Sequence, residues 1–119
     1  MRATSAEASA TPDSFQTVSV LSIDMAVVAG RKYYATATIT ITPGMGGATV
    51  VGDWYFKGAL RMSGATAVTD ADGIAVLASM TTPAKSGDTF MFMVTDIVAS
   101  GYIYDESSNV ETSDSIAVP

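Results

Sequence analysis

The chain has 119 residues, 48% of them hydrophobic and 15% charged, which is the composition of one globular domain rather than of a disordered segment. It contains no cysteine and no histidine, which excludes disulfides, cysteine zinc sites, a thiol nucleophile and the commonest general base. Twelve acidic and six basic residues give a net charge of −6. Because the basic residues are scattered along the sequence, we expect no nucleic-acid partner.

The composition also bears on where the protein works. An acidic surface with few lysines suits a soluble protein outside the cell, so we expect an extracellular or cell-surface location. No apolar run approaches the roughly 20 residues of a membrane span, and no span is expected. The start of the chain lacks the apolar stretch of a signal peptide. For an exported protein this implies that the signal has been removed, or that the sequence is a piece of a longer chain.

Two regions differ in composition. Residues 1–14 are rich in Ala, Ser and Thr and contain Pro12, which is typical of a tail or linker. Residues 15–119 are expected to form the folded domain.

Two strands are predicted at the start of the domain. The first, or a pair of short ones, covers 15–28 with Val18 and Val20 facing inward, and a kink or bulge is expected at Asp24 because the apolar pattern changes phase there. The second, at 35–42, alternates strictly between apolar residues and threonine, as in a strand with one buried and one wet face. Its predicted inward residues are Ala35, Ala37, Ile39 and Ile41.

A glycine-rich turn at 43–47 leads into a third strand at 48–56. After a turn, residues 60–69 are predicted to contain one or two short strands. In the strand at 48–56 the two faces are Val50, Gly52, Trp54 and Phe56 on one side, and Thr49, Val51, Asp53 and Tyr55 on the other.

The second half of the chain continues the same pattern. An Asp-Gly turn at 70–73 precedes a strand at 74–79, and further strands are predicted at 88–98, 101–105 and, weakly, 116–118. In the strand at 88–98 one face carries Phe90, Phe92 and Val94, and the other carries Met91, Met93 and Thr95. About seven strands and no helix predict an all-β, Ig-like antiparallel sandwich with Greek-key pairing.

An ordered series of segments carries a family resemblance. The segments are 35–41 (Ala-Thr-Ala-Thr-Ile-Thr-Ile), 47–50 with Gly52 and Trp54, 69–73 (Thr-Asp-Ala-Asp-Gly), 88–94 (Asp-Thr-Phe-Met-Phe-Met-Val), 101–105 (Gly-Tyr-Ile-Tyr-Asp) and 109–114 (Asn-Val-Glu-Thr-Ser-Asp). The series resembles the Ig-like, or fibronectin type III-like, accessory domains of secreted proteases and other exported bacterial and archaeal proteins. It is more distantly similar to the Ig-like domains of invasin-type adhesins. The resemblance covers residues 15–114.

The resemblance implies a non-catalytic module that acts as a spacer, a stabiliser or an attachment surface. We expect Trp54 in the core, with Gly52 leaving room beside its ring and Gly73 permitting a hairpin turn. The chain departs from the family pattern at 44–47, where a polar turn is usual, and at two outward methionines, where polar residues are usual. The predicted core anchors are Trp54, Phe90, Phe92, Ile39 and Ile41.

The Asp-Ala-Asp-Gly turn at 70–73 resembles the opening of a calcium loop. An EF-hand needs a Glu about twelve residues on, and the residue there is Thr81, so that loop is excluded. A hairpin turn is the first interpretation. The alternative is a calcium site of another kind, provided that the loops involved share one end of the sandwich. Its candidate ligands are Asp70, Asp72, Asp105 and Glu106. We otherwise expect no cofactor.

No catalytic constellation is recognisable. Serine is plentiful, but there is neither a histidine nor a Ser-x-x-Lys motif to activate it. The carboxylates fall mainly in turns and at strand ends. The Gly-rich turn at 44–47 lacks the Lys-Ser/Thr and the helix of a phosphate loop. We therefore expect that the protein is not an enzyme.

Several apolar residues are predicted to face outward, where a stripe of adaptable methionines would mark a contact with a partner. The alternative is the opposite strand phase, which would bury them. The residues are Met62, Met91, Met93, Val51 and Tyr55. Five tyrosines could instead stack on sugars, although strand tyrosines more often cover sheet faces; they are Tyr33, Tyr34, Tyr55, Tyr102 and Tyr104.

These observations support three functions. The first is an extracellular Ig-like module that gives structural support and binds a protein partner, a neighbouring domain or a surface. The second is a self-assembling, homo-oligomeric subunit of a filament or particle surface, joined through apolar residues or by strand addition from residues 1–14 or 106–119. The third is a carbohydrate-binding module.

Overall fold

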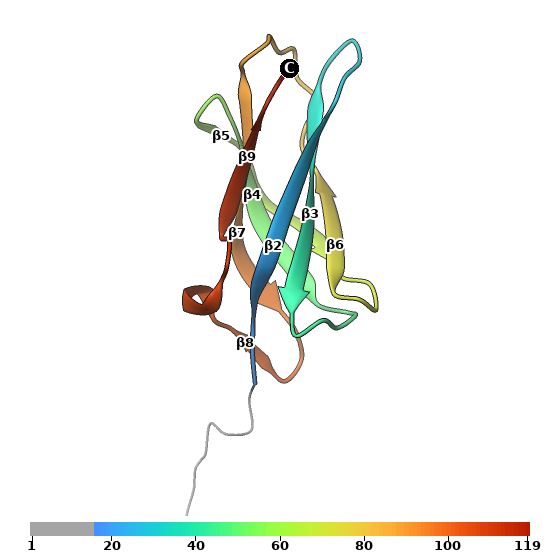
Figure 1. The fold of residues 1–119 in the computed structure, drawn as a ribbon, viewed down its shortest axis with the longest axis vertical. Helices are drawn as coiled ribbons and strands as arrows, with labels where there is room; N and C mark the ends of the chain where they lie inside the picture. The colour runs from blue at the N-terminus through green and yellow to red at the C-terminus, as the bar shows by residue number, and fades with distance from the viewer. Residues whose placement is uncertain (1–15) are drawn as a thin grey trace, which may run out of the picture.

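Two four-stranded β-sheets packed face to face make up the fold (Figure 1). The computed structural model describes residues 16–119, so the predicted tail at 1–14 and Phe15 lie outside the described residues. The prediction of an all-β sandwich is confirmed. Between residues 16 and 119 no helix has the length and apolar character needed to cross a bilayer.

The described residues form eight strands and one short 3₁₀ helix. In chain order they are β2 (Gln16–Val28), β3 (Tyr34–Thr42), β4 (Thr49–Phe56), β5 (Ala59–Val68), β6 (Ile74–Ala78), β7 (Thr89–Val98), β8 (Tyr102–Tyr104), η2 (Glu106–Ser108) and β9 (Ser113–Ala117).

One sheet has the strand order β6-β3-β2-β8, and the other has the order β5-β4-β7-β9. All neighbouring strands are antiparallel except β2 and β8, which are parallel. The chain passes from one sheet to the other after β3, β5, β6, β7 and β8. Long-range pairing of this kind ties distant parts of the sequence into one core.

The core between the sheets is filled by alternate residues of the strands. Along β3 and β4 every second side chain is buried, as the period of two predicts. Trp54 and Phe92 pack with tilted rings whose centroids are 4.9 Å apart, and Phe56 and Phe90 pack at 4.8 Å. The five residues expected as core anchors are each at most 1% exposed: Trp54, Phe90, Phe92, Ile39 and Ile41.

Gly52 makes room for a different ring from the one expected. A Cβ atom at this position would overlap Cζ of Phe92 and lie 2.6 Å from the carbonyl oxygen of Met93. The space beside Gly52 is therefore taken by Phe92 on the neighbouring strand β7, and not by Trp54 on its own strand.

The irregularity in β2 lies three residues before the predicted position. The β2–β3 register shifts between Val20 and Ser22, whereas Asp24 pairs regularly with Thr38. Beside the bulge at Leu21 the backbone of Val20 is bonded to the end of the chain. Its N–H donates to Oδ1 of Asn109 at 2.7 Å, and its carbonyl accepts from the N–H of residue 110. The bulge thus serves a connection to the end of the chain, which the apolar pattern does not reveal.

Two other strands are longer than predicted. Residues 60–69 do not form one or two short strands, because β5 runs unbroken over Ala59–Val68 with register shifts against β4. The weak strand expected at 116–118 begins three residues earlier, at Ser113, because it pairs with β7 from Met93 onward.

The 43–47 turn and the 70–73 turn pack on each other at one end of the sandwich. Gly73 has a φ of 81°, and a Cβ there would lie 2.7 Å from Cα of Gly44. Glycine is required at both positions because the two backbones touch.

Candidate functional site

A group of apolar side chains lies on the outer face of the β5-β4-β7-β9 sheet. Tyr55 of β4 is directly opposite Met91 of β7, and Met93 is opposite Asp53. We call Val51, Tyr55, Met91 and Met93 the methionine face; all four are partly exposed. Leu60, opposite Tyr55 on the edge strand β5, is 53% exposed and extends this face to the sheet edge. Apolar side chains of three strands therefore share this face, with the carboxylate of Asp53 between Val51 and Tyr55.

Met62 does not belong to this face. It was expected to point outward with the other methionines, but it packs against the buried core. The cause is the shifted pairing of β4 with β5, which places Met62 opposite the inward residue Trp54. Gly64, with a φ of 72°, accommodates this irregularity, and its N–H donates to the carboxylate of Asp53 at 3.0 Å.

The outer face of the other sheet has a different chemistry. There β3 presents Thr36, Thr38 and Thr40, which are partly exposed, and β2 adds the exposed Asp24. Val76 of β6 is the exposed apolar residue opposite Thr38. The centre of this face is therefore a row of threonine hydroxyls, with the apolar residues Ile74, Val76 and Ala26 on the strands beside it. The central strands of the other sheet instead present methionine, tyrosine and valine.

The four calcium candidates do not assemble. No group of three or more acidic side chains that could hold a metal ion occurs in residues 16–119. Asp70 accepts from the N–H groups of Asp72 and Ile74 at 2.9 and 3.1 Å, so its carboxylate closes the 70–73 turn. Figure 1 shows this turn and η2 on opposite sides of the sandwich. The two acidic loops thus do not share the site that a calcium ion would need.

Asp105 has a separate local role as the N-cap of η2. Its carboxylate accepts from the hydroxyls of Ser107 and Ser108 at 2.6 and 2.7 Å. These hydrogen bonds favour the charged form and lower the pKa of the Asp105 carboxyl below its ordinary value. The loop around Asp105 is therefore held by its own side chains.

The tyrosines do not form a common stacking platform. Tyr33, Tyr102 and Tyr104 pack against the core, whereas Tyr55 lies on the methionine face. Tyr33 pairs with Thr82 at one end of the sandwich, and Tyr102 pairs with Gln16 at the other. Only Tyr102 and Tyr104, two residues apart on β8, share one strand face.

A polar network joins β8 to the following connection. Nδ2 of Asn109 donates to the hydroxyl of Tyr104 at 2.6 Å and to Oγ1 of Thr112 at 3.1 Å. Burial raises the pKa of Tyr104, the hydrogen bond from Asn109 opposes this, and the negative charges of Glu106 and Asp96 raise it further. The network is structural, because it fixes the 105–112 connection onto β2.

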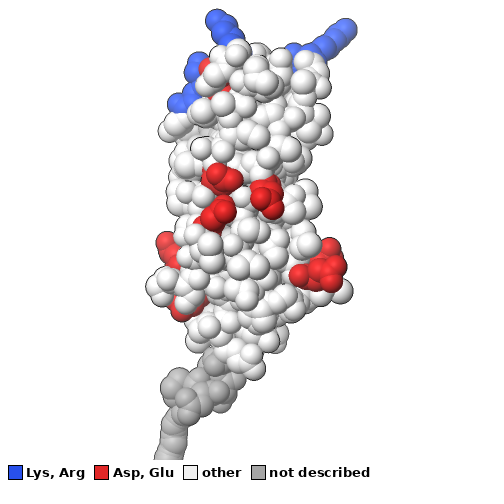
Figure 2. All heavy atoms as spheres, in the orientation of Figure 1, with Lys and Arg blue, Asp and Glu red and all other residues white. Residues whose placement is uncertain are grey.

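The five basic residues between 16 and 119, scattered in sequence, gather at one end of the fold (Figure 2). Lys57 and Lys85 line one hollow there, and the guanidinium of Arg61 lies 5.9 Å from the ring of Phe56 in the same hollow. The turn at 29–33 carries Arg31 and Lys32. It lies at the same end, because the N–H of Tyr33 donates to the carbonyl of residue 82 at 2.8 Å. We call this the basic end; its charged residues are Arg31, Lys32, Lys57, Arg61, Lys85 and Asp88.

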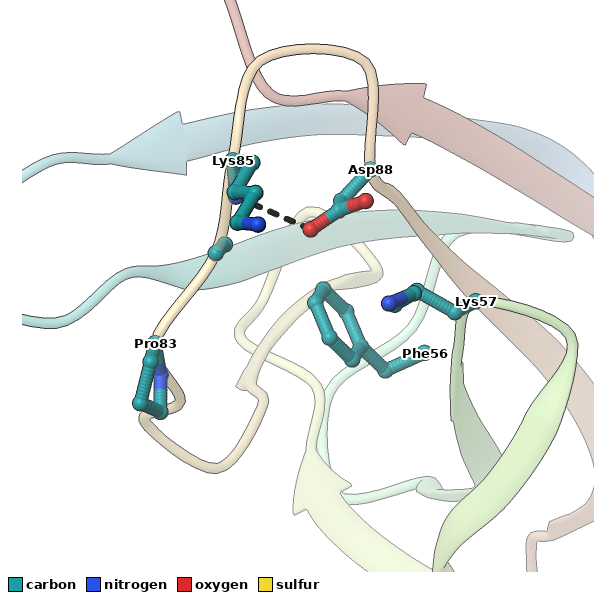
Figure 3. A pocket seen from close by; sticks show the side chains of 6 residues that line it. Phe56, Lys57, Pro83, Lys85 and Asp88 are labelled. Carbon is teal, nitrogen blue, oxygen red and sulfur yellow. Dashed lines mark hydrogen bonds between the residues drawn. The ribbon is translucent and has the colours of Figure 1, made fainter.

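The hollow has a volume of about 270 Å³ and is shown in Figure 3. The Phe56 ring lies between Lys57 and the loop that carries Lys85 and Asp88. The carboxylate of Asp88 accepts from the backbone N–H of Lys85 at 2.9 Å, which holds the loop closed. The hollow has an apolar floor, two lysines and the carboxylate of Asp88, so one net positive charge remains to attract a small anionic group such as a carboxylate.

Sequence reasoning missed the basic end because it read charge along the chain. The usable signal was the alternation of connections: where successive strands span the length of the sandwich, as from β2 to β7, every second connection lies at the same end. The turns at 29–33, 57–58 and 79–88 are alternate connections, and they hold four of the five cations of the described chain.

Comparison with protein-family models, with curated proteins and with solved structures gave no significant match.

Proposed function

We propose that this chain is a non-catalytic, extracellular or cell-surface Ig-like module that gives structural support and attaches to a protein partner through the methionine face. The observation that carries the proposal is the contrast between the outer faces of its two sheets. On the central strand β3 of one sheet the outward residues from 36 to 40 are threonines, whereas the central strands β4 and β7 of the other sheet carry partly exposed methionine, tyrosine and valine. Apolar surface of this kind marks protein contacts.

The strand order supports an Ig-like, Greek-key interpretation of the fold. Ig-like sandwiches place strand B beside strand E in one sheet and strand C beside strand F in the other. With β2 as strand A, the neighbours β3 and β6 correspond to B and E, and β4 and β7 correspond to C and F. Domains of this fold host many functions, so the proposal rests on the surface and not on the fold alone.

The proposal is tested by making the apolar sheet face resemble the other one. The variant Val51→Thr/Tyr55→Thr/Met91→Thr keeps the strands but removes the apolar contact area. We expect it to fold and to be washed from the envelope of the producing cells, where the unchanged chain is retained. The matched control, Thr36→Ala/Thr38→Ala/Thr40→Ala on the other sheet, should be retained like the unchanged chain. Equal retention of both variants would contradict the proposal.

A second candidate function is self-assembly into a filament or particle surface. It is favoured by β5, an edge strand of ten residues with a single charge, which can pair with a strand of another copy. Light scattering on the full chain distinguishes this function: a mass well above one chain, unchanged by salt, would support it. A monomer that still binds the cell envelope would favour the first function.

A further inference from the structure

The two ends of the sandwich carry opposite charges. The basic end holds five cations and one carboxylate, and all five cations are exposed. The opposite end and its flanks carry carboxylates; they are Asp70, Asp72, Asp96, Asp105 and Glu106, which we call the acidic end. Figure 2 shows the cations at one end of the long axis and the acidic groups over the middle and lower parts of the visible face.

The charges of the two ends do not neutralise each other within one molecule. Strands of eight to ten residues, such as β4 and β7, separate them by about 30 Å at roughly 3.3 Å per residue. This distance is several times the Debye length of about 8 Å at physiological ionic strength. Both ends are therefore available to groups outside the molecule.

We propose that the basic end of one copy docks onto the acidic end of a second copy, so that copies associate head to tail along the long axis. The polarity of the chain fits this arrangement. β2 begins at the acidic end, whereas the carbonyl of Val118 accepts from Gly87 at the basic end, at 2.8 Å. A translation along the axis thus brings unlike charges together, and such a contact repeats without closing into a ring.

The hollow at the basic end gives the contact a specific receptor. Lys57 and Lys85 are exposed beside the Phe56 ring, and a carboxylate entering the hollow would meet both ammonium groups. On the acidic end Asp72 and Glu106 are exposed, whereas Asp70 and Asp105 are engaged in their own turns. Asp72 and Glu106, which lie on opposite sides of the acidic end, are therefore the groups available to a second copy, and either one could enter the hollow.

A second copy is a better occupant than an unrelated polyanion. A long nucleic acid or acidic polysaccharide extends beyond the basic end and meets the acidic groups on the rest of a chain whose net charge is −6. A second copy aligned on the long axis presents its acidic end to the basic end of the first copy. The other charged groups of the second copy then lie farther from the contact. This association uses neither the methionine face nor a sheet edge, and it goes beyond the proposed function.

The size of the contact predicts that it is weak. Four strands about 4.8 Å apart, in two sheets about 10 Å apart, give an end surface of a few hundred Å². A standard stable interface buries about 800 Å² on each partner. We therefore expect a dissociation constant above roughly 10 μM, with a strong dependence on salt.

Charge exchange between the two ends tests the proposal by sedimentation velocity on the full chain at low and high salt. One variant, Lys57→Asp/Lys85→Glu, makes both ends acidic; Asp is used at 57 because that residue has a φ of 53°, which Asp tolerates. The other variant, Asp72→Lys/Glu106→Lys, makes both ends basic. We expect the unchanged chain to associate at low salt and to dissociate at high salt. Each variant alone should remain a monomer, and an equimolar mixture of the two should associate again.

Several results would overturn the proposal. A monomer at all concentrations and salts would do so, as would association that survives both charge reversals or a mixture that stays monomeric. Retention of a monomeric chain on immobilised heparin or polyphosphate, lost in the Lys57→Asp/Lys85→Glu variant, would assign the basic end to a polyanion instead. None of these results bears on the methionine face, because contacts of apolar surface are not removed by salt.

Discussion

Trp54 is the largest side chain of the core, and its indole N–H has no hydrogen-bond partner although the residue is fully buried. An unsatisfied buried donor of this kind costs about 1–3 kcal/mol, so the ring stabilises the fold through its apolar area and its packing on Phe92.

Replacement of Trp54 should therefore depend strongly on the substitute. We expect Trp54→Ala to lower the free energy of unfolding by about 3–5 kcal/mol, as for other large cavities in a core. Trp54→Phe keeps an aromatic ring and removes the orphaned N–H, so its cost should be less than half as large. Urea unfolding followed by circular dichroism measures both, since the tryptophan signal is lost. Equal losses for the two variants would contradict this account of the residue.

Gly52 should be intolerant of any side chain. Gly52→Ala is expected to cost at least about 1–3 kcal/mol, because the added methyl group overlaps the Phe92 ring. Phe92→Leu removes much of that ring, so the double variant should be more stable than the sum of the two single losses predicts. A double-mutant cycle by urea unfolding measures this coupling. Strict additivity would show that the ring is not what Gly52 accommodates.

At the scale of elements, the 105–112 connection is attached to β2 at the bulge. Asn109 accepts from the N–H of Val20 at 2.7 Å and donates to Tyr104, so one side chain joins β2, β8 and η2. The connection contains little regular structure, and its position depends on these bonds.

Asn109→Ala should therefore be costly for a surface connection. It leaves the Val20 N–H without its partner, and we expect a loss of about 1–3 kcal/mol in the free energy of unfolding. Tyr104→Phe, which removes one bond at the edge of the network, serves as the control and should cost about 1 kcal/mol or less. Hydrogen exchange of the Val20 amide reports the effect locally. An unchanged exchange rate in Asn109→Ala would contradict the role given to this side chain.

The same network predicts the response to alkaline pH. The pKa of Tyr104 is raised, so the folded state favours the neutral phenol. Its contribution to stability is complete below the unfolded pKa of about 10, and is lost as the pH rises through the higher folded pKa. The difference in absorbance at 295 nm between the unchanged chain and Tyr104→Phe gives this titration. We expect a midpoint above 10, and a midpoint at or below 10 would be inconsistent with the burial of Tyr104.

The elements show what sequence reasoning can and cannot reach. The alternation in 35–42 and 48–56 predicted the inward residues of β3 and β4, because a strand has a period of two. It failed where a bulge resets the phase: the shift falls at Leu21 rather than Asp24, and Met62 turns inward because β5 slips against β4. A bulge is decided by partners distant in sequence, such as Asn109, and a local pattern does not contain them.

At the scale of the whole molecule, charge is organised by topology rather than by sequence. Four of the five cations of residues 16–119 lie in alternate connections between strands, and these connections meet at one end. The proposed calcium set failed for the same reason, since Asp70 and Asp105 lie in connections that the sandwich holds apart. Strand order decides which loops meet, and one sequence does not reveal it.

The central claim is that a partner covers the outer face of the β5-β4-β7-β9 sheet when the protein is on the cells that produce it. Oxidation by hydrogen peroxide, read by mass spectrometry, tests this directly on the producing cells and on the purified chain. Met91 and Met93 are partly exposed, so they should oxidise readily after purification. On the cells we expect them to be protected, whereas Met25 and Met62, which pack against the core, should oxidise at the same rate in both. Equal oxidation of Met91 and Met93 in the two settings would show that nothing covers this face.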